Sequence, residues 1–526
     1  MTYAQAVKHL YALGPELAPT AAFGSNQPDA PRGSTSPRKF DLAHMRTLCQ
    51  ALGDPQNAVP SVLIAGTNGK GSTAATLASI LTAAGYRTGL YTSPHLSRVN
   101  ERIQMAHPDL PSEYGSLSVH NSDGPLTLTE IADEDFARLY THVDSIAQNL
   151  VSDRRLPWLP SFFERLTAMA FLYFAGDERL PRAEIMILEV GLGGRLDATN
   201  IVDPLISIIT DIALDHQEWL GDTVALIASE KAGVLRRNGK LITLSQHPEA
   251  NQAIGQAAAA LDVTGIDAAV YLPPAVRNTT GEVDLNAGDL DANRPSRTLP
   301  KQNRYTVAIN DEVEPGLLQV DSPLAGEHQR RNLALAIAAA IELRNNSRHI
   351  YRDISTSNDY ILPNLAIEQG IHKTRWPGRL ELLEPNLLLD VAHNPAGAWT
   401  LRAAIRALPQ ASPRTLIFSC LHDKDLSEMA HILFPLFDSS AGGDPLRLGD
   451  HVILAPIANP RAATVQDLLQ VAQELGIPAH AAPHLHAALT EARNVTPENG
   501  WIVATGSVYL VGEIRALALA EREFSA

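Results

Sequence analysis

The residues best suited to chemistry form a glycine-rich turn, Gly66-Thr67-Asn68-Gly69-Lys70-Gly71-Ser72-Thr73. The turn follows a short apolar run, 61–65, and precedes a segment with helical composition, 72–84. Its glycines let backbone amides approach an anion closely, and the N-terminus of a helix adds partial positive charge. Lys70 supplies a full charge for the terminal phosphates of a nucleotide, and the hydroxyl residues after it can contact a phosphate or Mg²⁺.

The turn departs from the common phosphate-loop pattern, in which serine or threonine follows the lysine directly. Gly71 intervenes here, and the loop before Lys70 is short. The alternative is a glycine-rich strand–helix turn that binds nothing. The order of strand, glycines, lysine, hydroxyl residues and helix favours nucleotide binding.

A carboxylate and a histidine follow two later apolar runs. Glu189 ends the run 184–190, where a hard oxygen ligand would face a crevice and suit Mg²⁺. The alternative is a glutamate paired with a lysine or arginine. His216 follows the run 205–210. A lone histidine there is more often a loop residue than a ligand, but the edge that we expect it to share with Glu189 favours a ligand.

Alternating strands and helices predict an α/β protein with two domains. We expect residues 1–375 to form a domain of the phosphate-loop type, with a mostly parallel sheet and flanking helices. We expect residues 376–526 to form a smaller Rossmann-like α/β domain. The predicted strands are 61–65, 88–92, 184–190, 205–210, 387–391, 415–419, 451–455 and 501–505, and the predicted helices include 72–84, 161–175, 227–233 and 462–475.

Three stretches rich in turn-forming residues interrupt this alternation, at 14–38, 107–127 and 274–303. They show little periodicity and are predicted to be loops or insertions. Long loops of this kind serve either as surface segments or as lids.

Composition excludes several classes of protein. The 526 residues carry a formal charge of −16, which argues against broad nucleic-acid binding. The two cysteines, Cys49 and Cys420, form neither a metal-ligand cluster nor a disulfide framework and fit a reducing compartment. We find no signal peptide and no apolar run long enough to span a membrane. These features predict a soluble globular protein of a reducing compartment, the cytoplasm.

At this point the motifs match a family. The chain resembles folylpolyglutamate synthase and dihydrofolate synthase, members of the Mur ligase superfamily. The motifs that carry the resemblance are GTNGKGS (66–72), TSPHL (92–96), NERI (100–103), SFFERLTAMAF (161–171), EVGLGGRLDATN (189–200), LDHQEWLGDT (214–223), IASEKAG (227–233), GEHQRRN (326–332), WPGRLE (376–381) and ATGSVYLVGE (504–513). One departure is Val391, where the family usually has glycine; Asp390, His393 and Asn394 around it are retained.

The resemblance implies roles for individual residues. ATP would be held by residues 66–73, including Lys70, together with Asn332, Arg379 and Asp390. Two Mg²⁺ ions are implied, with Ser93, Glu189, His216 and Lys231 as ligands. Lys231 matches a lysine that relatives carry as a carbamate, although the pair Glu230-Lys231 on its own would be a solvated charge pair. His393 would lie near the transferred phosphate, and Phe162, Phe163 and Asp197 match the region that receives a pteridine.

The implied activity is ATP-dependent ligation of glutamate to a folate or pterin carboxylate through an acyl phosphate, by a monomer. The acceptor stays open between dihydropteroate and a folate that already bears glutamate. One alternative is a cell-wall ligase that adds an amino acid to a muramyl nucleotide. Another is a non-catalytic ATP-binding regulatory module.

Overall fold

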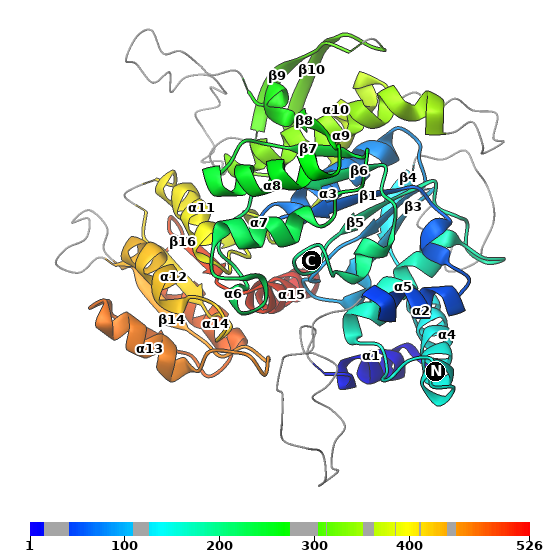
Figure 1. The fold of residues 1–526 in the computed structure, drawn as a ribbon. Coiled ribbons are helices and arrows are strands. Elements are labelled where there is room, and N and C mark those ends of the chain that lie inside the picture. Colours follow the sequence, from blue (N-terminus) through cyan, green and yellow to red (C-terminus); the bar gives the residue numbers. More distant parts are fainter. Residues whose placement is uncertain are drawn as a thin grey trace. The chain divides into compact units, whose positions relative to one another are not determined.

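The computed structural model describes residues 1–14, 42–108, 126–273, 303–311, 313–350, 362–383, 386–409, 412–438 and 449–525 (Figure 1). The three predicted insertions, 14–38, 107–127 and 274–303, lie outside the described residues except at their ends. The chain forms two compact units. The first comprises Met1–Ala269, Asp311–Glu314 and Leu335–Ile371, and the second Val270–Asn310, Pro315–Ala334 and His372–Ala526.

The first unit is built on an eight-stranded sheet with the order β4-β3-β2-β5-β1-β6-β7-β8. Its pairs β2–β3 and β3–β4 are antiparallel, and its other pairs are parallel. Every residue of the four central strands is buried, which explains their continuous apolar runs. The strands are β1 (Ser61–Ala65), β2 (Thr88–Tyr91), β3 (Ile103–Pro108), β4 (Leu126–Glu130), β5 (Ile185–Glu189), β6 (Ile206–Ile209), β7 (Lys240–Thr243) and β8 (Thr264–Asp267).

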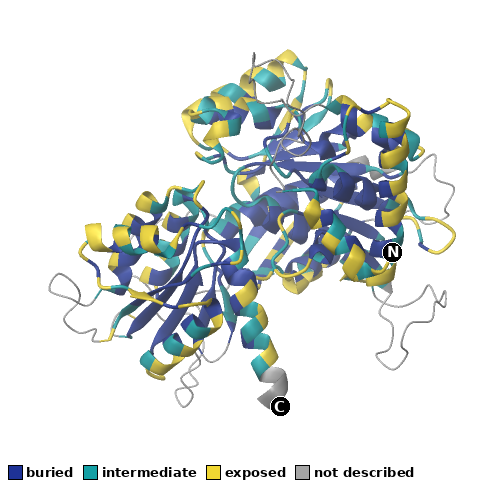
Figure 2. Cartoon of the chain, turned by 90° about the horizontal axis from the view of Figure 1, so that it is seen from below, coloured by how far each residue is buried: buried dark blue, intermediate teal, exposed yellow. Residues whose placement is uncertain are grey.

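Helices surround this sheet, with their exposed residues turned away from it (Figure 2). The central one, α3, is buried along most of its length. Gly370 of α10 fits against α3 so closely that a Cβ there would lie 2.3 Å from the Cα of Ile80. The helices of the unit are α1 (Tyr3–Ala12), α2 (Leu42–Ala51), α3 (Lys70–Ala83), α4 (Asp133–Ser152), α5 (Phe162–Ala175), α6 (Gln217–Leu220), α7 (Val224–Ala232), α8 (Pro248–Ala260) and α10 (Asn364–Lys373), and α9 (His328–Ile350) contributes residues to both units.

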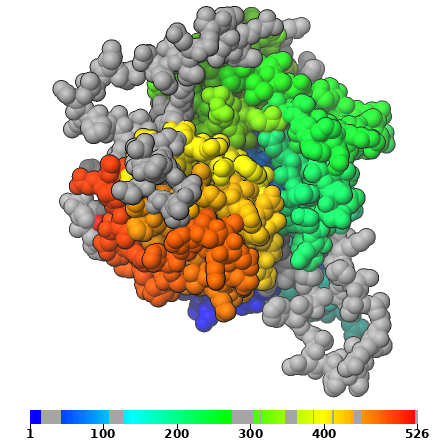
Figure 3. Space-filling view, turned by 90° about the vertical axis from the view of Figure 1, so that its left-hand side faces the viewer, coloured from blue at the N-terminus to red at the C-terminus, as the bar shows by residue number. Residues whose placement is uncertain are grey.

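The second unit contains a six-stranded sheet with the order β11-β12-β16-β13-β14-β15 and a separate hairpin, β9–β10. Within the sheet only the pair β11–β12 is antiparallel. The strands are β9 (Asn303–Ile309), β10 (Gly316–Ser322), β11 (Glu381–Leu383), β12 (Leu387–Leu389), β13 (Arg414–Phe418), β14 (His451–Leu454), β15 (His480–Ala481) and β16 (Trp501–Thr505), and the helices are α11 (Pro395–Arg406), α12 (Leu426–Leu433), α13 (Val465–Glu474), α14 (Leu485–Val495) and α15 (Val508–Ser525). The surface of the C-terminal part of this unit is coloured from yellow to red in Figure 3.

The predicted fold class, α/β with two sheets, is confirmed, and each predicted strand matches an observed one within two residues at either end. The stretch 107–127 was predicted wholly as a loop, and this was wrong at its ends. β3 runs on to Pro108 and β4 begins at Leu126. Most of β4 is exposed, so it lacks the apolar run that marks the buried strands. Within the described residues, no helix is both long and apolar enough to cross a membrane.

Candidate active site

The glycine-rich turn connects β1 to α3 at the carboxyl edge of the first sheet. A Cβ on Gly66 would lie 1.8 Å from Oγ1 of Thr210, so only glycine fits there. Gly69 has a φ of +90° and caps α3, whose first residue is Lys70. The backbone amides of Thr67 and Asn68 donate to the carbonyl of Asp211 at 2.9 and 3.1 Å. The segment that directly follows β6 therefore holds the turn in place.

Two lysines converge on one carbonyl of this turn. Nζ of Lys70 donates to the carbonyl oxygens of Gly66 at 3.0 Å and Thr67 at 3.2 Å. Nζ of Lys231, from α7, donates to the same Gly66 oxygen at 2.7 Å. Burial, and then the nearby charge of Lys70, lower the pKa of Lys231 to about 7. The turn is thus a place where positive charge is concentrated and where one amine is neutral in part of the molecules at pH 7.

The buried carboxylate of Glu189 lies at the same edge. Glu189 is the last residue of β5, which pairs with β1 and β2. Its Oε2 accepts a hydrogen bond from the backbone amide of Ser93 at 3.1 Å, and the residue is 4% exposed. The structure therefore brings together two of the predicted metal ligands, Glu189 and Ser93.

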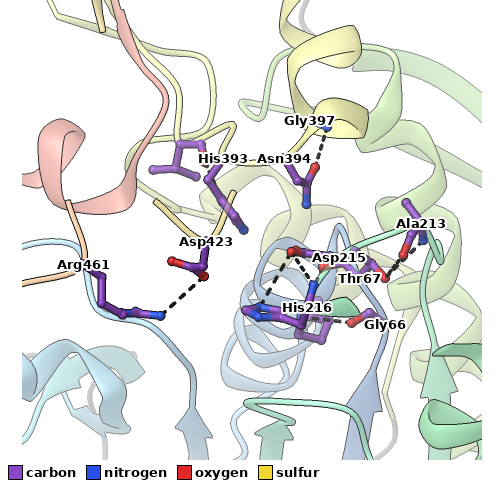
Figure 4. A network of polar contacts seen from close by, with 12 residues as sticks. Gly66, Thr67, Ala213, Asp215, His216, His393, Asn394, Gly397, Asp423 and Arg461 are labelled. Carbon is purple, nitrogen blue, oxygen red and sulfur yellow. Dashed lines mark hydrogen bonds and ion pairs between the residues drawn. The ribbon is translucent and has the colours of Figure 1, made fainter. Parts of the chain in front are cut away.

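His216 is the N-cap residue of α6 and adopts the left-handed conformation, with φ of +52°. Its backbone amide donates to Oδ1 of Asp215 at 2.9 Å, and its Nε2 lies 3.9 Å from that oxygen (Figure 4). The hydroxyl of Thr67 accepts from the amide of Ala213 and donates to the carbonyl of the same residue, both at 3.1 Å. These bonds tie the segment that carries His216 to the phosphate turn. Among the described residues, no three His, Cys, Asp or Glu side chains gather closely enough to hold a metal ion.

The residues predicted to receive the pteridine fall into two groups. Phe163 lies over Gly191, where a Cβ would be 2.6 Å from its Cζ, and the ring is 6.0 Å from that of Tyr91. Phe162 is instead buried under the guanidinium of Arg102, 5.3 Å from the ring centre. Of the two, Phe163 is the more accessible.

The carboxylate of Asp197 is occupied by its own loop. Its Oδ2 accepts from the amides of Gly191 and Leu192, both at 3.0 Å. Its Oδ1 accepts from the amide of Thr199 at 3.0 Å and from its hydroxyl at 2.5 Å. Burial raises the pKa of Asp197, while these hydrogen bonds oppose the rise. Asp197 braces the glycine loop that follows Glu189.

In the second unit, Asp390 plays a similar bracing part. It follows β12, and its two oxygens accept from the amides of Leu380 at 3.0 Å and Ala392 at 2.9 Å. Burial raises the pKa of Asp390, and the charge of Arg379 opposes this rise. Nδ1 of His393 lies 2.9 Å from the carbonyl of Val391. A carbonyl only accepts, so Nδ1 carries a proton.

Asn332 belongs to α9, and its Nδ2 donates to Oε1 of Gln329 at 2.9 Å. Asn394 caps α11 by accepting from the amide of Gly397 at 2.8 Å (Figure 4). The capping role of Asn394 accounts for the asparagine after His393.

Sequence reasoning missed several residues that shape these sites. Glu230, which the sequence alone predicts to be in a solvated charge pair, forms an ion pair with Arg195 at 2.8 Å, and the amide of Arg195 donates to the carbonyl of Glu230 at 2.9 Å. In the second unit, Arg461 pairs with Asp423 at 3.5 Å (Figure 4). Neither pair is close in sequence, so no local pattern could have indicated it.

Comparison with known proteins agrees with these features. Residues 378–508 match the family described as "Mur ligase, glutamate ligase domain". The dihydrofolate synthase/folylpolyglutamate synthase of Bacillus subtilis is 30% identical over 480 residues, which cover 91% of this chain and 94% of that protein.

Two solved structures extend the likeness to the fold. The folylpolyglutamate synthase of Mycobacterium tuberculosis complexed with ADP has a TM-score of 0.69 and 26% identity, covering 91% of this chain and 94% of its own. A folylpolyglutamate synthase in complex with AMPPCP and folate has a TM-score of 0.69 and 27% identity, covering 99% of this chain and 100% of its own. The chain belongs to the folylpolyglutamate synthase/dihydrofolate synthase family of Mur ligases.

Proposed function

We propose that this protein is an ATP-dependent, ADP-forming ligase that joins the amino group of L-glutamate to a carboxylate of a pterin or folate. The observation that carries the proposal is the pair of lysines on the Gly66 carbonyl, beside the buried carboxylate of Glu189. Such an arrangement suits a triphosphate and the charge that moves during phosphoryl transfer. Its relatives are glutamate ligases of folates, and two of them are solved with ADP or with AMPPCP and folate.

ATP would lie against residues 66–73, with Lys70 facing its terminal phosphates. The backbone amides at the start of α3 add partial positive charge there. Asn332, Arg379 and Asp390 are proposed as further contacts to the nucleotide, on the strength of the family motifs. For Asp390 the contact would be indirect, because both of its oxygens already brace the turn around Leu380.

An amine does not displace oxide from a carboxylate at a useful rate, because oxide is a poor leaving group. The carboxylate must therefore be activated first. The acceptor carboxylate attacks the γ-phosphorus, the bond to the β–γ bridging oxygen breaks, and ADP leaves with an acyl phosphate remaining. The amine of glutamate then attacks the acyl carbon, loses a proton, and phosphate departs from the tetrahedral intermediate. Lys70 would neutralise charge on the transferred phosphoryl group, and each such placed donor contributes roughly 2–4 kcal/mol. His393 is proposed to lie close to this group.

Mg²⁺ fits the residues present. Glu189 is a buried carboxylate with one oxygen on the Ser93 amide, and magnesium sites commonly use one or two carboxylates together with substrate phosphates. Ser93, Glu189 and His216 would hold the metal, which would supply charge neutralisation for the phosphates.

Lys231 is proposed to carry a carbamate. Its amine has a pKa of about 7, and only a neutral amine adds to carbon dioxide. The carbamate would change a buried cation into an oxygen donor near the proposed metal ligands.

The acceptor would pack against Phe163, with Phe162 supporting that wall from the core and Asp197 holding the neighbouring loop. We further propose a domain boundary near residue 375, a monomeric enzyme and a cytoplasmic location. The two free, buried cysteines fit a reducing compartment.

The test is a substrate panel with the purified chain, ATP, Mg²⁺ and glutamate. We expect a product one glutamyl unit heavier with dihydropteroate, with tetrahydrofolate, or with both, and stoichiometric ADP. Ligation to a muramyl nucleotide instead would favour the cell-wall alternative. ADP release that is independent of acceptor and glutamate would overturn the proposal.

A further inference from the structure

The first turn of α5 is held from α2 by a histidine that the proposed mechanism does not use. His44 is 7% exposed, and its Nδ1 lies 2.9 Å from Oε1 of Glu164. Its Nε2 lies 3.1 Å from the carbonyl of Trp158, and its ring stacks on that indole at 5.5 Å and 20°. His44 thus contacts the chain on both sides of Ser161, the N-cap of α5: at Trp158, three residues before the cap, and at Glu164, three residues after it.

The partners of the ring decide its protonation. The Trp158 carbonyl only accepts, so Nε2 carries a proton. Glu164 is an acceptor too, because its other oxygen receives the amide and the hydroxyl of Ser161, both at 2.8 Å. Burial acts to raise the pKa of Glu164, but the bonds from His44 and Ser161 hold it below its usual value. Both ring nitrogens of His44 therefore face oxygen acceptors, an arrangement that an imidazolium satisfies by donating from each nitrogen in a charge-assisted clamp.

A second contact fixes the same segment from the other side. Arg165, which is fully buried, donates through Nε to the carbonyl of Pro160 at 3.1 Å and forms an ion pair with Asp144 of α4. Segment 158–165 is therefore held between α2 and α4. Little freedom remains for the first turn of α5.

That turn carries the wall of the proposed acceptor site. Phe163 directly precedes Glu164, and its ring touches Gly191, two residues beyond Glu189. A shift of the turn by a fraction of an ångström moves the ring relative to this loop. The clamp is thus coupled to the acceptor side of the site, whereas the phosphate turn is held by Asp211 and Thr210.

We propose that His44 is a positioning residue for the acceptor, because its doubly donating imidazolium fixes the entry to α5 and so the place of Phe163 over Gly191. This inference rests on the proposed function. It assigns His44 no contact with substrate.

The test compares KM values for the acceptor and for ATP in the full chain. His44→Ala should raise the KM for tetrahydrofolate or dihydropteroate by about tenfold, the scale of a lost hydrogen bond to a charged group, with the KM for ATP changed less than about twofold. His44→Gln keeps one donor and should have a smaller effect. Glu342→Gln is the matched control, because it breaks a lysine–glutamate pair of the same unit (Lys240–Glu342) and should leave both KM values unchanged.

A chemical readout separates positioning from general loss of stability. Imidazole added to His44→Ala should restore the acceptor KM, while 1-methylimidazole, which cannot donate from both nitrogens, should not. Should His44→Gln and His44→Ala, both folded by circular dichroism, keep the normal acceptor KM, the role of His44 is overturned. Equal increases in both KM values would overturn it too. Absence of ligation by the unaltered protein would instead defeat the proposed function itself.

Discussion

The carboxyl edges of the two sheets use buried charge in opposite ways. At the first, the ammonium groups of Lys70 and Lys231 share the Gly66 carbonyl, and Lys231 is pushed toward its neutral form. At the second, the buried carboxylate of Asp390 braces backbone amides under the influence of Arg379. The first edge is prepared for incoming negative charge, whereas the second preserves the shape of a turn.

The same bracing device also occurs in the first unit, at Asp197. A buried aspartate is therefore a feature that the two units share. The difference between the two edges lies in the lysines of the first. Changes to the lysines should act on catalysis, and changes to the bracing aspartates on stability and on one substrate each.

The strongest test of this contrast is Lys70→Ala. We expect ligation to fall about a thousandfold, because the full positive charge that faces the terminal phosphates is lost. The measurement is ADP formation that depends on acceptor and glutamate. Lys240→Ala serves as the control, because Lys240 lies on β7 and pairs with Glu342 of α9, and its rate should stay within about twofold. A near-normal rate for Lys70→Ala would remove the phosphate turn from the mechanism.

Glu189→Gln should lower kcat by roughly a hundredfold and raise the Mg²⁺ concentration needed for half-maximal rate, since an amide is a poorer ligand for a hard cation. Glu184→Gln is the matched control, because Glu184 lies just before the opposite end of the same strand and accepts from the amide of Arg87. The two variants are compared by titrating Mg²⁺. An identical magnesium dependence in both would contradict a metal-binding role for Glu189.

Lys231 makes stability depend on pH. Its pKa is about 7 in the folded protein against 10.5 as the ordinary value, so the unfolded chain binds more protons between these two values. Burial of the charged amine therefore lowers the free energy of unfolding most below pH 7. This loss becomes smaller as the pH rises toward 10. Lys231→Met should gain most over the unaltered protein near pH 6 and least near pH 9.

Urea unfolding at both pH values, without Mg²⁺ or added bicarbonate, measures this difference, with Lys240→Met as the control. A gain in stability that does not vary with pH would mean that the pKa of Lys231 is not lowered to about 7 in the folded protein. For activity, Lys231→Ala should be partly rescued by short carboxylic acids, and failure of rescue in the folded variant would count against a carbamate.

The smallest effects should come from the two bracing aspartates. Asp197→Asn and Asp390→Asn should each lower the free energy of unfolding by about 1–2 kcal/mol, since an amide cannot accept at both ends. Asp197→Asn should raise chiefly the acceptor KM, and Asp390→Asn chiefly the ATP KM, each less than about tenfold. Asp203→Asn, at a side chain that is 91% exposed, is the control. Equal increases in both KM values for both variants would contradict the proposed difference between the two edges.

Much of the first unit was predictable because its signals are local. The turn 66–73 lies between a buried strand and a helix, and Glu189 ends a fully buried strand, so pattern alone indicated that both meet at one edge. The exposed strand β4 and the hairpin β9–β10 gave no such pattern, because most of their residues are not buried in a sheet core. Prediction failed where the apolar signal is weak.

The sequence by itself determined the α/β alternation, the phosphate turn and the family motifs, since each depends on residues that are neighbours along the chain. Only the tertiary structure decided that Lys231 and Lys70 donate to the same carbonyl, that the carboxylate of Asp197 accepts from its own loop, and that His44 is hydrogen-bonded to Glu164. The reason is physical. The protonation and orientation of a buried polar group depend on its removal from water and on its hydrogen-bond partners. These partners can be distant along the chain, as Gly66 and Lys231 are at 165 residues apart, so local spacing does not predict them.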